Sequence, residues 1–504
     1  MRCPAATKAF SPGSLTIRIS TASGFRPATR QIGVTNARMV LSISASRMSW
    51  SRWPDCAHAF ASGVATARTR QAKMAKRRDT RVPMDNARDG RWGRQSRVVA
   101  LLAAACLMLA ACGESGTRAP EIASAADARQ GGIRSQGVVV TDSFRAYAGA
   151  DEGFAAEAAR DALNAGGNAV DAVVAGYFAL AVTLPSAASL GAHGACVVHL
   201  HGTRTAAAFG FPSVPAGRTN GGPVAVPTAV RGVALMHLRH GKLRWEQLVA
   251  PAERLARAGV PVSPGLARDL QAAGLSSPGS VWLQPDLAAV LGALRQSGGG
   301  DFAQGRLARQ LAEQSAPTGA GLSLDTIRAA IPIAGPTVTE AFGSHRVHGV
   351  PAPLGGPQAL AAWRGGAAAT GAGGGVAGVV AVDSEASAAA CSFSMGVPFG
   401  ARTVVPGMGI WLAAPAGDPV SPLIVANPAN GEFFFAGVAR SGSQIGAFAR
   451  AALAGDGAVE QAFASRGAGV TAIACPRGLR GNQQSCRAGT DPGGFGLVVP
   501  ALGR

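Results

Sequence analysis

Histidine and cysteine side chains are the first candidates for chemistry in this chain, because together they can ligate a transition metal. Five histidines lie in one stretch of the sequence: His193, His199, His201, His237 and His240. They fall on different predicted elements, and neither they nor the cysteines have the spacing of a metal site. The sequence therefore predicts solvated or hydrogen-bonded histidines, with no metal and no other cofactor.

Four cysteines lie between residue 190 and the end of the chain. Cys475 and Cys486 flank a ten-residue loop, which predicts a local disulfide if the chain is exported. Cys196 and Cys391 lie in apolar, strand-like runs. We expect these two to be buried thiols.

The elements that must position such residues are helices in the first half and strand pairs in the second. A helix is predicted over residues 152–164, and a Gly-Gly-Asn cap then starts a second helix over 169–183. The second helix is apolar on nearly all sides, so it must be buried. Residues 376–396 consist of an apolar run, a polar turn at 384–387 and a second run of small residues, which predicts a β-hairpin. This order predicts an α+β fold in which helices cover sheets.

The formal net charge of +19 could indicate a protein that binds nucleic acid, but the charge is unevenly distributed. Residues 1–111 contain 19 of the 47 basic residues and only 4 of the 28 acidic residues. The excess is therefore almost confined to one end, as in a targeting or non-native segment. We predict no nucleic-acid partner.

A targeting signal ends at Cys112. Arginines precede the apolar run Val98–Ala111, whose 14 residues are too few to span a bilayer and are typical of a secretory signal. The run closes in L-A-A-C-G, residues 109–113, which resembles the lipobox of bacterial lipoproteins. The resemblance implies cleavage before Cys112 and a diacylglycerol on its thiol, which would tether the chain to a membrane.

The chain is accordingly divided into four parts. We predict a disordered upstream extension, a lipoprotein signal peptide, a polar tether and one folded domain, over residues 1–83, 84–111, 112–136 and 137–504 respectively. Lipidation would place the domain in a bacterial cell envelope, facing the periplasm. Gly113 after the cysteine favours the outer membrane over the inner one, by resemblance to proteobacterial lipoproteins.

Several motifs, in order, resemble the γ-glutamyltransferase family, also known as glutathione hydrolases. They are A-G-G-N-A-V-D-A-V-V-A at 165–175, the stretch at 226–263 that begins with V-P-T-A-V-R-G-V, P-A-P-L-G-G at 351–356, V-V-P-G-M-G-I at 404–410, and D-P-G-G-F-G-L at 491–497. The resemblance extends over nearly all of residues 137–500.

The resemblance implies an N-terminal-nucleophile hydrolase fold, a four-layer αββα sandwich of two antiparallel sheets between helices. Members of the family cut their own chain before a threonine. The new amine then helps to activate that threonine, which attacks a γ-glutamyl amide while backbone N–H groups stabilise the oxyanion.

The match breaks at the cut site. When the family's T-T-H-x-S-V-V-D is aligned on Asp383, Val376 takes the place of the threonine. Valine has the shape of threonine but no oxygen, so it can neither attack a carbonyl nor begin self-cleavage. The nearest upstream hydroxyl is that of Thr370, six residues earlier and off the predicted strand. No residue is therefore assigned as the catalytic nucleophile.

Substrate contacts of the family also change. The arginine that holds the substrate's α-carboxylate has no counterpart in residues 208–215. The resemblance assigns Ser394 to a family threonine, Asp418 to the acid that binds the substrate amine, and Ser441 and Gly442 to the oxyanion loop. These four are the candidate substrate-binding residues.

Three hypotheses arise for the function. The first is a γ-glutamyltransferase-like envelope lipoprotein that has lost γ-glutamyl transfer and hydrolysis, and that binds a peptide, a γ-glutamyl-type ligand or an active relative. The second is an amide hydrolase that uses Ser394, Ser441 or Thr370 instead. The third is a structural envelope protein. The changes at the site favour the first.

Overall fold

The computed structural model describes residues 146–366, 374–415, 420–455, 457–464, 469–481, 483–490 and 495–502, all within the compact unit Thr117–Arg504. The predicted extension, signal peptide and tether, with Cys112, lie outside the described residues, as do Thr370 and Asp418. Among the described helices, none has the length and apolar character needed to cross a bilayer.

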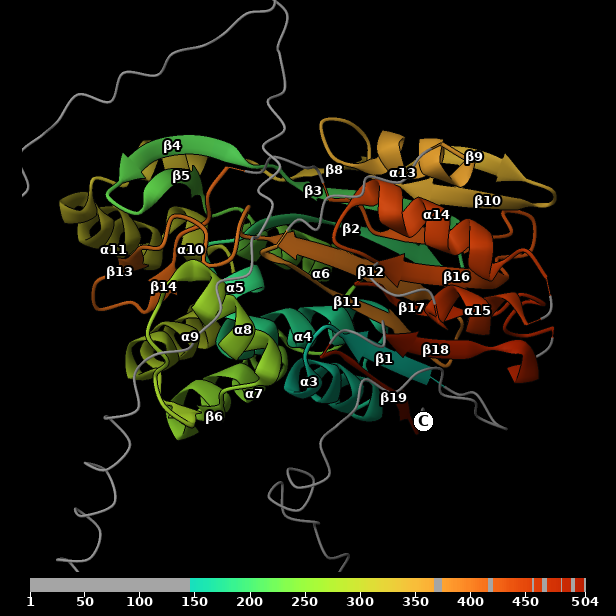
Figure 1. Cartoon of the computed structure of the whole chain (residues 1–504), viewed down its shortest axis with the longest axis horizontal. Helices are drawn as coiled ribbons and strands as arrows, with labels where there is room; N and C mark the ends of the chain where they lie inside the picture. The colour runs from blue at the N-terminus through green and yellow to red at the C-terminus, as the bar shows by residue number, and fades with distance from the viewer. Residues whose placement is uncertain are drawn as a thin grey trace, which may run out of the picture. The chain divides into compact units, whose positions relative to one another are not determined.

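Two antiparallel sheets face each other at the centre of the domain (Figure 1). The first has seven strands, in the order β19 (Leu497–Ala501), β1 (Ala146–Ala150), β11 (Val376–Val382), β12 (Ala388–Ser394), β2 (His193–Leu200), β3 (Thr205–Phe211) and β8 (Ile333–Pro336). The second has six, in the order β18 (Arg487–Thr490), β17 (Thr471–Ala474), β16 (Phe433–Val438), β15 (Leu423–Ala426), β10 (His345–Gly349) and β9 (Val338–Phe342). Val380, Val438 and Ile473 belong to the apolar cluster between them.

Helices cover the outer face of each sheet. On the seven-stranded sheet lie α3 (Gly153–Asn164), α4 (Ala169–Thr183) and α6 (Ala229–His240), with α7 (Trp245–Ala258) and α9 (Pro285–Ser297) packed behind α4. On the six-stranded sheet lie α13 (Gly356–Trp363), α14 (Gly442–Ala452) and α15 (Ala458–Ala464). The predicted four-layer αββα sandwich is confirmed (Figure 1).

The remaining elements lie at the margins of these layers. They are α5 (Pro185–Ala188), α8 (Pro264–Ala273), α10 (Asp301–Gln304), α11 (Arg306–Ser315), α12 (Leu324–Ala329), and three short hairpins: β4 (Val214–Thr219) with β5 (Gly222–Val226), β6 (Val260–Pro261) with β7 (Val281–Trp282), and β13 (Val404–Val405) with β14 (Ile410–Trp411).

Helix α4 is the central buried helix, with the bounds that its sequence predicts. All its residues are buried, because its small and branched apolar side chains pack on α3, α7 and β11 together. Its N-terminus has a capping box: Asn168 Oδ1 accepts from the Asp171 N–H, and Asp171 Oδ2 accepts from the Asn168 N–H, both at 3.0 Å. The Gly-Gly-Asn motif is therefore structural.

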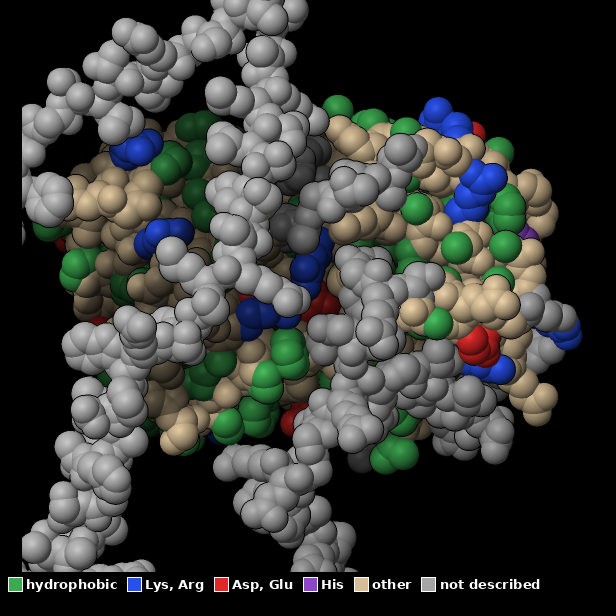
Figure 2. Space-filling view, viewed as in Figure 1, with side chains coloured by type: hydrophobic (Ala, Val, Ile, Leu, Met, Phe, Trp, Pro, Cys, Tyr) green, Lys and Arg blue, Asp and Glu red, His purple; other side chains and the backbone are tan. Residues whose placement is uncertain are grey.

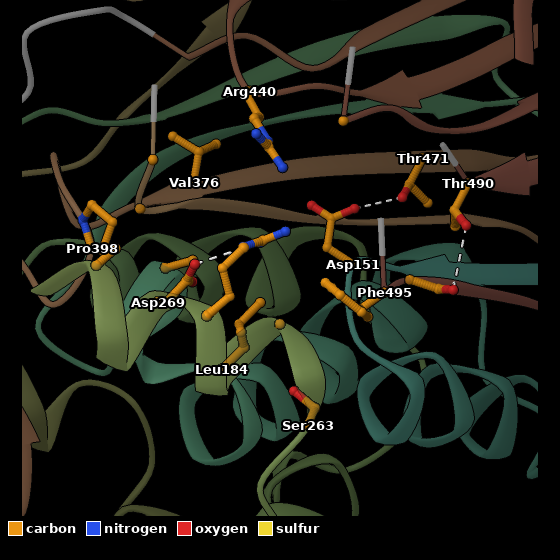
Figure 3. Close-up of a pocket in the computed structure, with 18 of the residues that line it drawn as sticks. Asp151, Leu184, Ser263, Asp269, Val376, Pro398, Arg440, Thr471, Thr490 and Phe495 are labelled. Carbon is orange, nitrogen blue, oxygen red and sulfur yellow. Dashed lines mark hydrogen bonds and ion pairs between the residues drawn. The ribbon is translucent and has the colours of Figure 1, made fainter. Parts of the chain in front are cut away.

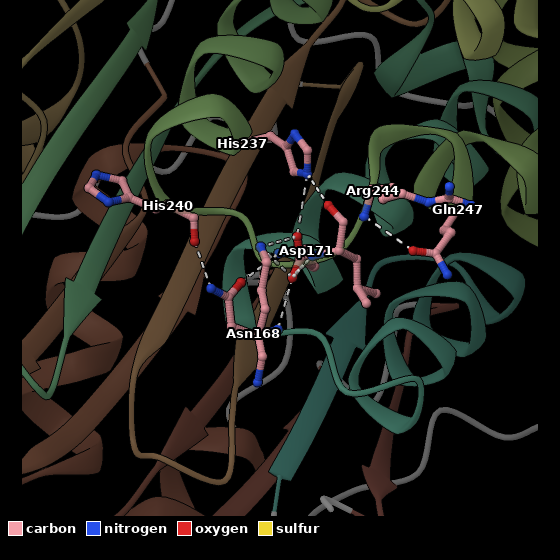
Figure 4. Close-up of polar contacts among 8 residues, drawn as sticks. Asn168, Asp171, His237, His240, Arg244 and Gln247 are labelled. Atoms are coloured by element: carbon pink, nitrogen blue, oxygen red, sulfur yellow. Dashed lines mark hydrogen bonds and ion pairs between the residues drawn. The ribbon is translucent and has the colours of Figure 1, made fainter.

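Asp171 also connects this cap to the turn after α6 (Figure 4). Its carboxylate accepts hydrogen bonds from the backbone N–H groups of Lys242 and Leu243, at 3.0 to 3.1 Å. The His237 ring lies 3.5 Å from Asp171 Oδ1. Since the side chain is fully buried, these donors replace the water that a carboxylate would otherwise need.

A second carboxylate holds the β11–β12 hairpin on the same cap. Asp383 Oδ2 accepts from the Ala169 N–H at 3.1 Å, and Oδ1 accepts from the N–H groups of Glu385 and Ser387. Burial raises the pKa of Asp383, which these hydrogen bonds partly oppose. The position of β11 is therefore fixed by the N-terminus of α4.

Replacing Asp171 by alanine should destabilise the fold strongly. Asp171→Ala leaves the part-buried hydrogen bonds from the N–H groups of Asn168, Lys242 and Leu243 without their acceptor, which should cost about 3 kcal/mol in total. Urea unfolding, followed by circular dichroism, measures this free energy. Asp161→Ala, an exposed carboxylate on α3, is the control and should change the free energy by less than about 0.5 kcal/mol. Equal effects of both substitutions would contradict the role given to Asp171.

Two histidines are buried between the sheets. His199 on β2 lies with Nε2 2.9 Å from the Gly431 carbonyl, and His348 on β10 lies with Nδ1 2.8 Å from Thr337 Oγ1. Burial, together with the nearby His199 and Arg346, lowers the pKa of His348 to about 4. Burial also lowers the pKa of His199. Both rings are therefore neutral in the folded chain near pH 7.

Acidification should destabilise the sandwich through these rings. The unfolded chain binds protons near pH 6.5, whereas folded His348 does so only near pH 4. The contribution of neutral His348 to stability is therefore fully present above pH 6.5 and is lost as the pH falls toward 4. Urea unfolding between pH 7 and 4.5 measures this effect. As the pH falls, the free energy of unfolding should decrease less steeply for His348→Gln than for the unchanged chain, by about 1.4 kcal/mol per pH unit. Equal slopes would show that His348 does not contribute.

Candidate functional site

Val376 lines a cavity of about 330 Å³ at one end of the sandwich (Figure 3). The end of β1, the start of β11 and the start of β17 meet there, and α8 closes the opposite side. The cavity is bounded by Asp151, Leu184, Ala187, Ser263, Gly265, Arg268, Asp269, Ala272, Gly374, Gly375, Val376, Pro398, Arg440, Gly469, Val470, Thr471, Thr490, Phe495 and Gly496. Residues from both sheets and from the helical layer therefore share one site.

The two carboxylates of the cavity are each hydrogen-bonded within the protein. Asp151 Oδ2 accepts from the Gly378 N–H at 2.9 Å and Oδ1 accepts from Thr471 Oγ1 at 2.5 Å. Asp269 Oδ2 accepts from Ser186 Oγ at 2.7 Å. Each carboxylate therefore has a structural function at the wall.

The two guanidinium groups are less satisfied. Arg268 on α8 lies 3.5 Å from Asp269 Oδ1 and stacks over the Phe495 ring, 5.2 Å from its centroid. Arg440 follows β16 and points between Val376 and Asp151 (Figure 3). Among the described residues, Arg440 has no hydrogen bond or ion pair. The cavity thus presents positive charge that can bind an anion.

The hydroxyl groups of the described lining all take part in hydrogen bonds within the protein. Thr471 donates to Asp151, and Thr490 Oγ1 donates to the Gly496 carbonyl at 3.3 Å. Ser263 Oγ accepts from the Leu266 N–H and caps α8. Within the described lining there is no histidine or lysine beside a hydroxyl, which is the arrangement that nucleophilic catalysis requires. The described side chains can bind and orient a ligand, but they provide no nucleophile with a base.

The described lining of the cavity contains none of the three sequence-predicted site residues that the structure describes, Ser394, Ser441 and Gly442. Ser394 pairs with Val376 across the β11–β12 ladder, and its buried Oγ accepts from the Gly396 N–H at 2.9 Å. Ser441 caps α14, with Oγ accepting from the Gln444 N–H at 3.3 Å. A Cβ atom on Gly442 would lie 2.4 Å from the Gly355 carbonyl oxygen, so close backbone packing explains this glycine.

The described part of the chain contains two disulfides, of which the sequence predicts one. Cys475 and Cys486 are joined, as expected from their loop. Cys196 and Cys391 are also joined, so the prediction of buried thiols for these two is wrong. They lie directly opposite each other on β2 and β12. Their pairing depends on the register of strands that are 195 residues apart, which the sequence alone does not specify.

Two arginines of the site are not predicted by the sequence. Arg440 immediately precedes the Ser441–Gly442 loop, so its position beside the site was the available signal. Arg268 lies in a helical stretch with no feature that distinguishes it from a surface arginine. Within the part of the chain that the structure describes, no group of three or more histidine, cysteine or acidic side chains could hold a metal ion.

Comparisons with known proteins agree with this architecture. The cephalosporin acylase of Bacillus halodurans has a similar structure, with a TM-score of 0.58 and 17% identity over 73% of this chain and 98% of that one. At this identity the likeness shows the fold alone. It places the domain in the class of N-terminal-nucleophile hydrolase folds, as the sequence predicts.

Sequence comparison gives the family. Residues 155–365 match the family described as Gamma-glutamyltranspeptidase. The glutathione hydrolase proenzyme of Escherichia coli (strain K12) is 27% identical over 39% of this chain and 40% of its own. That of Pseudomonas aeruginosa is 32% identical over 34% and 36%, and Scoloptoxin SSD14 of Scolopendra dehaani is 28% identical over 40% and 41%. The chain is therefore similar to the gamma-glutamyltranspeptidase family over residues 155–365. It spans only about two fifths of the length of these relatives, and the matched range ends before Val376.

Removing the Ser441 hydroxyl should affect stability in the manner of a helix cap. Ser441→Ala should lower the free energy of unfolding by about 1 kcal/mol, whereas Ser441→Gly should cost only a few tenths of a kcal/mol, because glycine is a tolerated cap. Urea unfolding of both variants measures the difference. If alanine cost no more than glycine, the hydroxyl would be free for another function.

Proposed function

We propose that this protein is a lipid-anchored member of its family that binds a ligand in the cavity beside Val376 and does not transfer or hydrolyse γ-glutamyl groups. The observation that supports it best is the position of Val376. This residue begins β11 and lines the cavity, at the place where the alignment on Asp383 puts the family's threonine. A methyl group there cannot form the acyl intermediate.

The surroundings of Val376 support the same proposal. The hydroxyl of Ser394, its cross-strand partner, and that of Ser441 already accept backbone hydrogen bonds, so neither is placed as a substitute nucleophile. Arg440, by contrast, lies in the cavity without an acceptor among the described residues. Binding without turnover is the activity that this arrangement favours.

Membrane attachment is the second part of the proposal. It rests on the sequence around Cys112, where cleavage and lipidation would hold the domain on the periplasmic face of a bacterial membrane, with the outer membrane favoured. The ligand would then be a small peptide or another small molecule of the envelope. An active relative remains a candidate partner, since the fold is shared.

Intact-mass spectrometry under denaturing, reducing conditions tests both parts on the chain isolated from a bacterial host. We expect one uncut chain that begins at Cys112 and has the added mass of acyl groups. Incubation with γ-glutamyl-p-nitroanilide should release no p-nitroaniline above the rate without protein. Two fragments, one with a new N-terminal serine or threonine, would overturn the catalytic part. An unacylated chain would overturn the anchor.

A further inference from the structure

Arg440 is a charged residue of the described lining whose hydrogen-bonding groups have no partner among the described residues. Arg440 is half-buried and extends from the end of β16 into the space between Val376 and Asp151 (Figure 3). A guanidinium has five N–H donors, and those that are turned away from water need an acceptor. Since no described residue accepts from Arg440, the missing acceptor is expected to come from a ligand.

The charged side chains around Arg440 indicate the charge of that ligand. Asp151 accepts from Gly378 and Thr471, and Asp269 accepts from Ser186 and from Arg268. The oxygens of both carboxylates thus have donors already. Arg268 has only a 3.5 Å contact with Asp269, which is the weak limit for a hydrogen bond. Among the described side chains of the lining, both carboxylates therefore already accept hydrogen bonds, whereas the guanidinium of Arg440 has donors that no described residue uses, which favours an anion over an ammonium group.

The apolar residues of the lining indicate the chemistry of the uncharged part of the ligand. Leu184, Ala187 and Val470 are buried apolar residues of the lining. Val376 and Phe495 add further apolar surface, and the Phe495 ring lies against the Arg268 guanidinium. A volume of about 330 Å³ is at the small end of ligand sites. It can hold a chain of several carbons, each of which gains free energy on burial.

We infer that the cavity binds a carboxylate with an apolar body, with Arg440 contacting the carboxylate and Val376 and Phe495 contacting the body. This inference rests on the proposed ligand-binding function and names its ligand class. It differs from recognition of a γ-glutamyl zwitterion, which would need a free acceptor for the ammonium group. Replacing a hydroxyl by the methyl of valine makes the wall more apolar, in agreement with such a ligand.

Isothermal titration calorimetry on the full chain tests the inference with four probes. Octanoate has the carboxylate and the apolar body, N-acetyl-L-phenylalanine presents the same chemistry as a peptide C-terminus, octylamine has the opposite charge, and L-glutamate is the zwitterion. Octanoate or N-acetyl-L-phenylalanine should bind at least about tenfold more tightly than octylamine or L-glutamate. The tighter of the first two identifies a free acid or a peptide terminus as the source.

Arg440→Gln should weaken the better of those two carboxylates by about tenfold or more, because a charged hydrogen bond is lost. Arg254→Gln is the matched control, since Arg254 is an exposed arginine on α7, away from the cavity. It should leave the affinity unchanged. Thermal unfolding of both variants should match the unchanged chain, so that any loss of affinity belongs to the site.

Three outcomes would overturn the inference: no binding of either carboxylate, equal binding of L-glutamate or octylamine, or unchanged affinity in Arg440→Gln. Each is distinct from failure of the proposed function, which self-cleavage or release of p-nitroaniline would show. An uncut chain that binds none of the probes would agree with the proposed loss of catalysis and would contradict only the inferred class of ligand.

Discussion

The structure depends on the N-terminus of one buried helix. The backbone N–H groups at the start of α4 need acceptors outside the helix, and the Asn168 amide and two buried carboxylates supply them. Asp171 connects that helix end to the turn after α6, and Asp383 connects it to the β11–β12 hairpin. Because the hairpin is held at its turn, the opposite end of β11 is directed to the cavity. The position of Val376 is thus set from the far end of its own strand.

The residues that hold the fold together are thus different from the residues at the proposed site. Asn168, Asp171 and Asp383 retain the residues of the family's motifs, and each has a structural hydrogen bond that explains its retention. The alignment on which the proposal rests puts Val376 in the place of a family threonine and Ser441 in the place of a family glycine, and both residues are compatible with the same backbone. Valine fits a strand as well as threonine does, and serine caps a helix better than glycine does. Under this proposal the fold would persist without the nucleophile.

The sequence predicts elements that depend on local features and misses contacts that depend on register or tertiary packing. The bounds of α4 were predictable because its cap, its apolar composition and the proline after it are all local. The Cys196–Cys391 disulfide was not, because opposite placement of these residues results from the pairing of β2 with β12. Arg440 was missed for a related reason. Its function depends on a cavity assembled from β1, β11, β17 and α8, and no single segment contains that information.

The proposed function requires that the cavity has no nucleophile. Covalent labelling tests this requirement: the chain is incubated with an electrophilic glutamine analogue, and its mass is compared with that of the untreated chain. An active glutathione hydrolase treated in parallel serves as the positive control. The account predicts an adduct on the control and none on this chain. An adduct mapped by peptide sequencing to a serine or threonine near Val376 would contradict it.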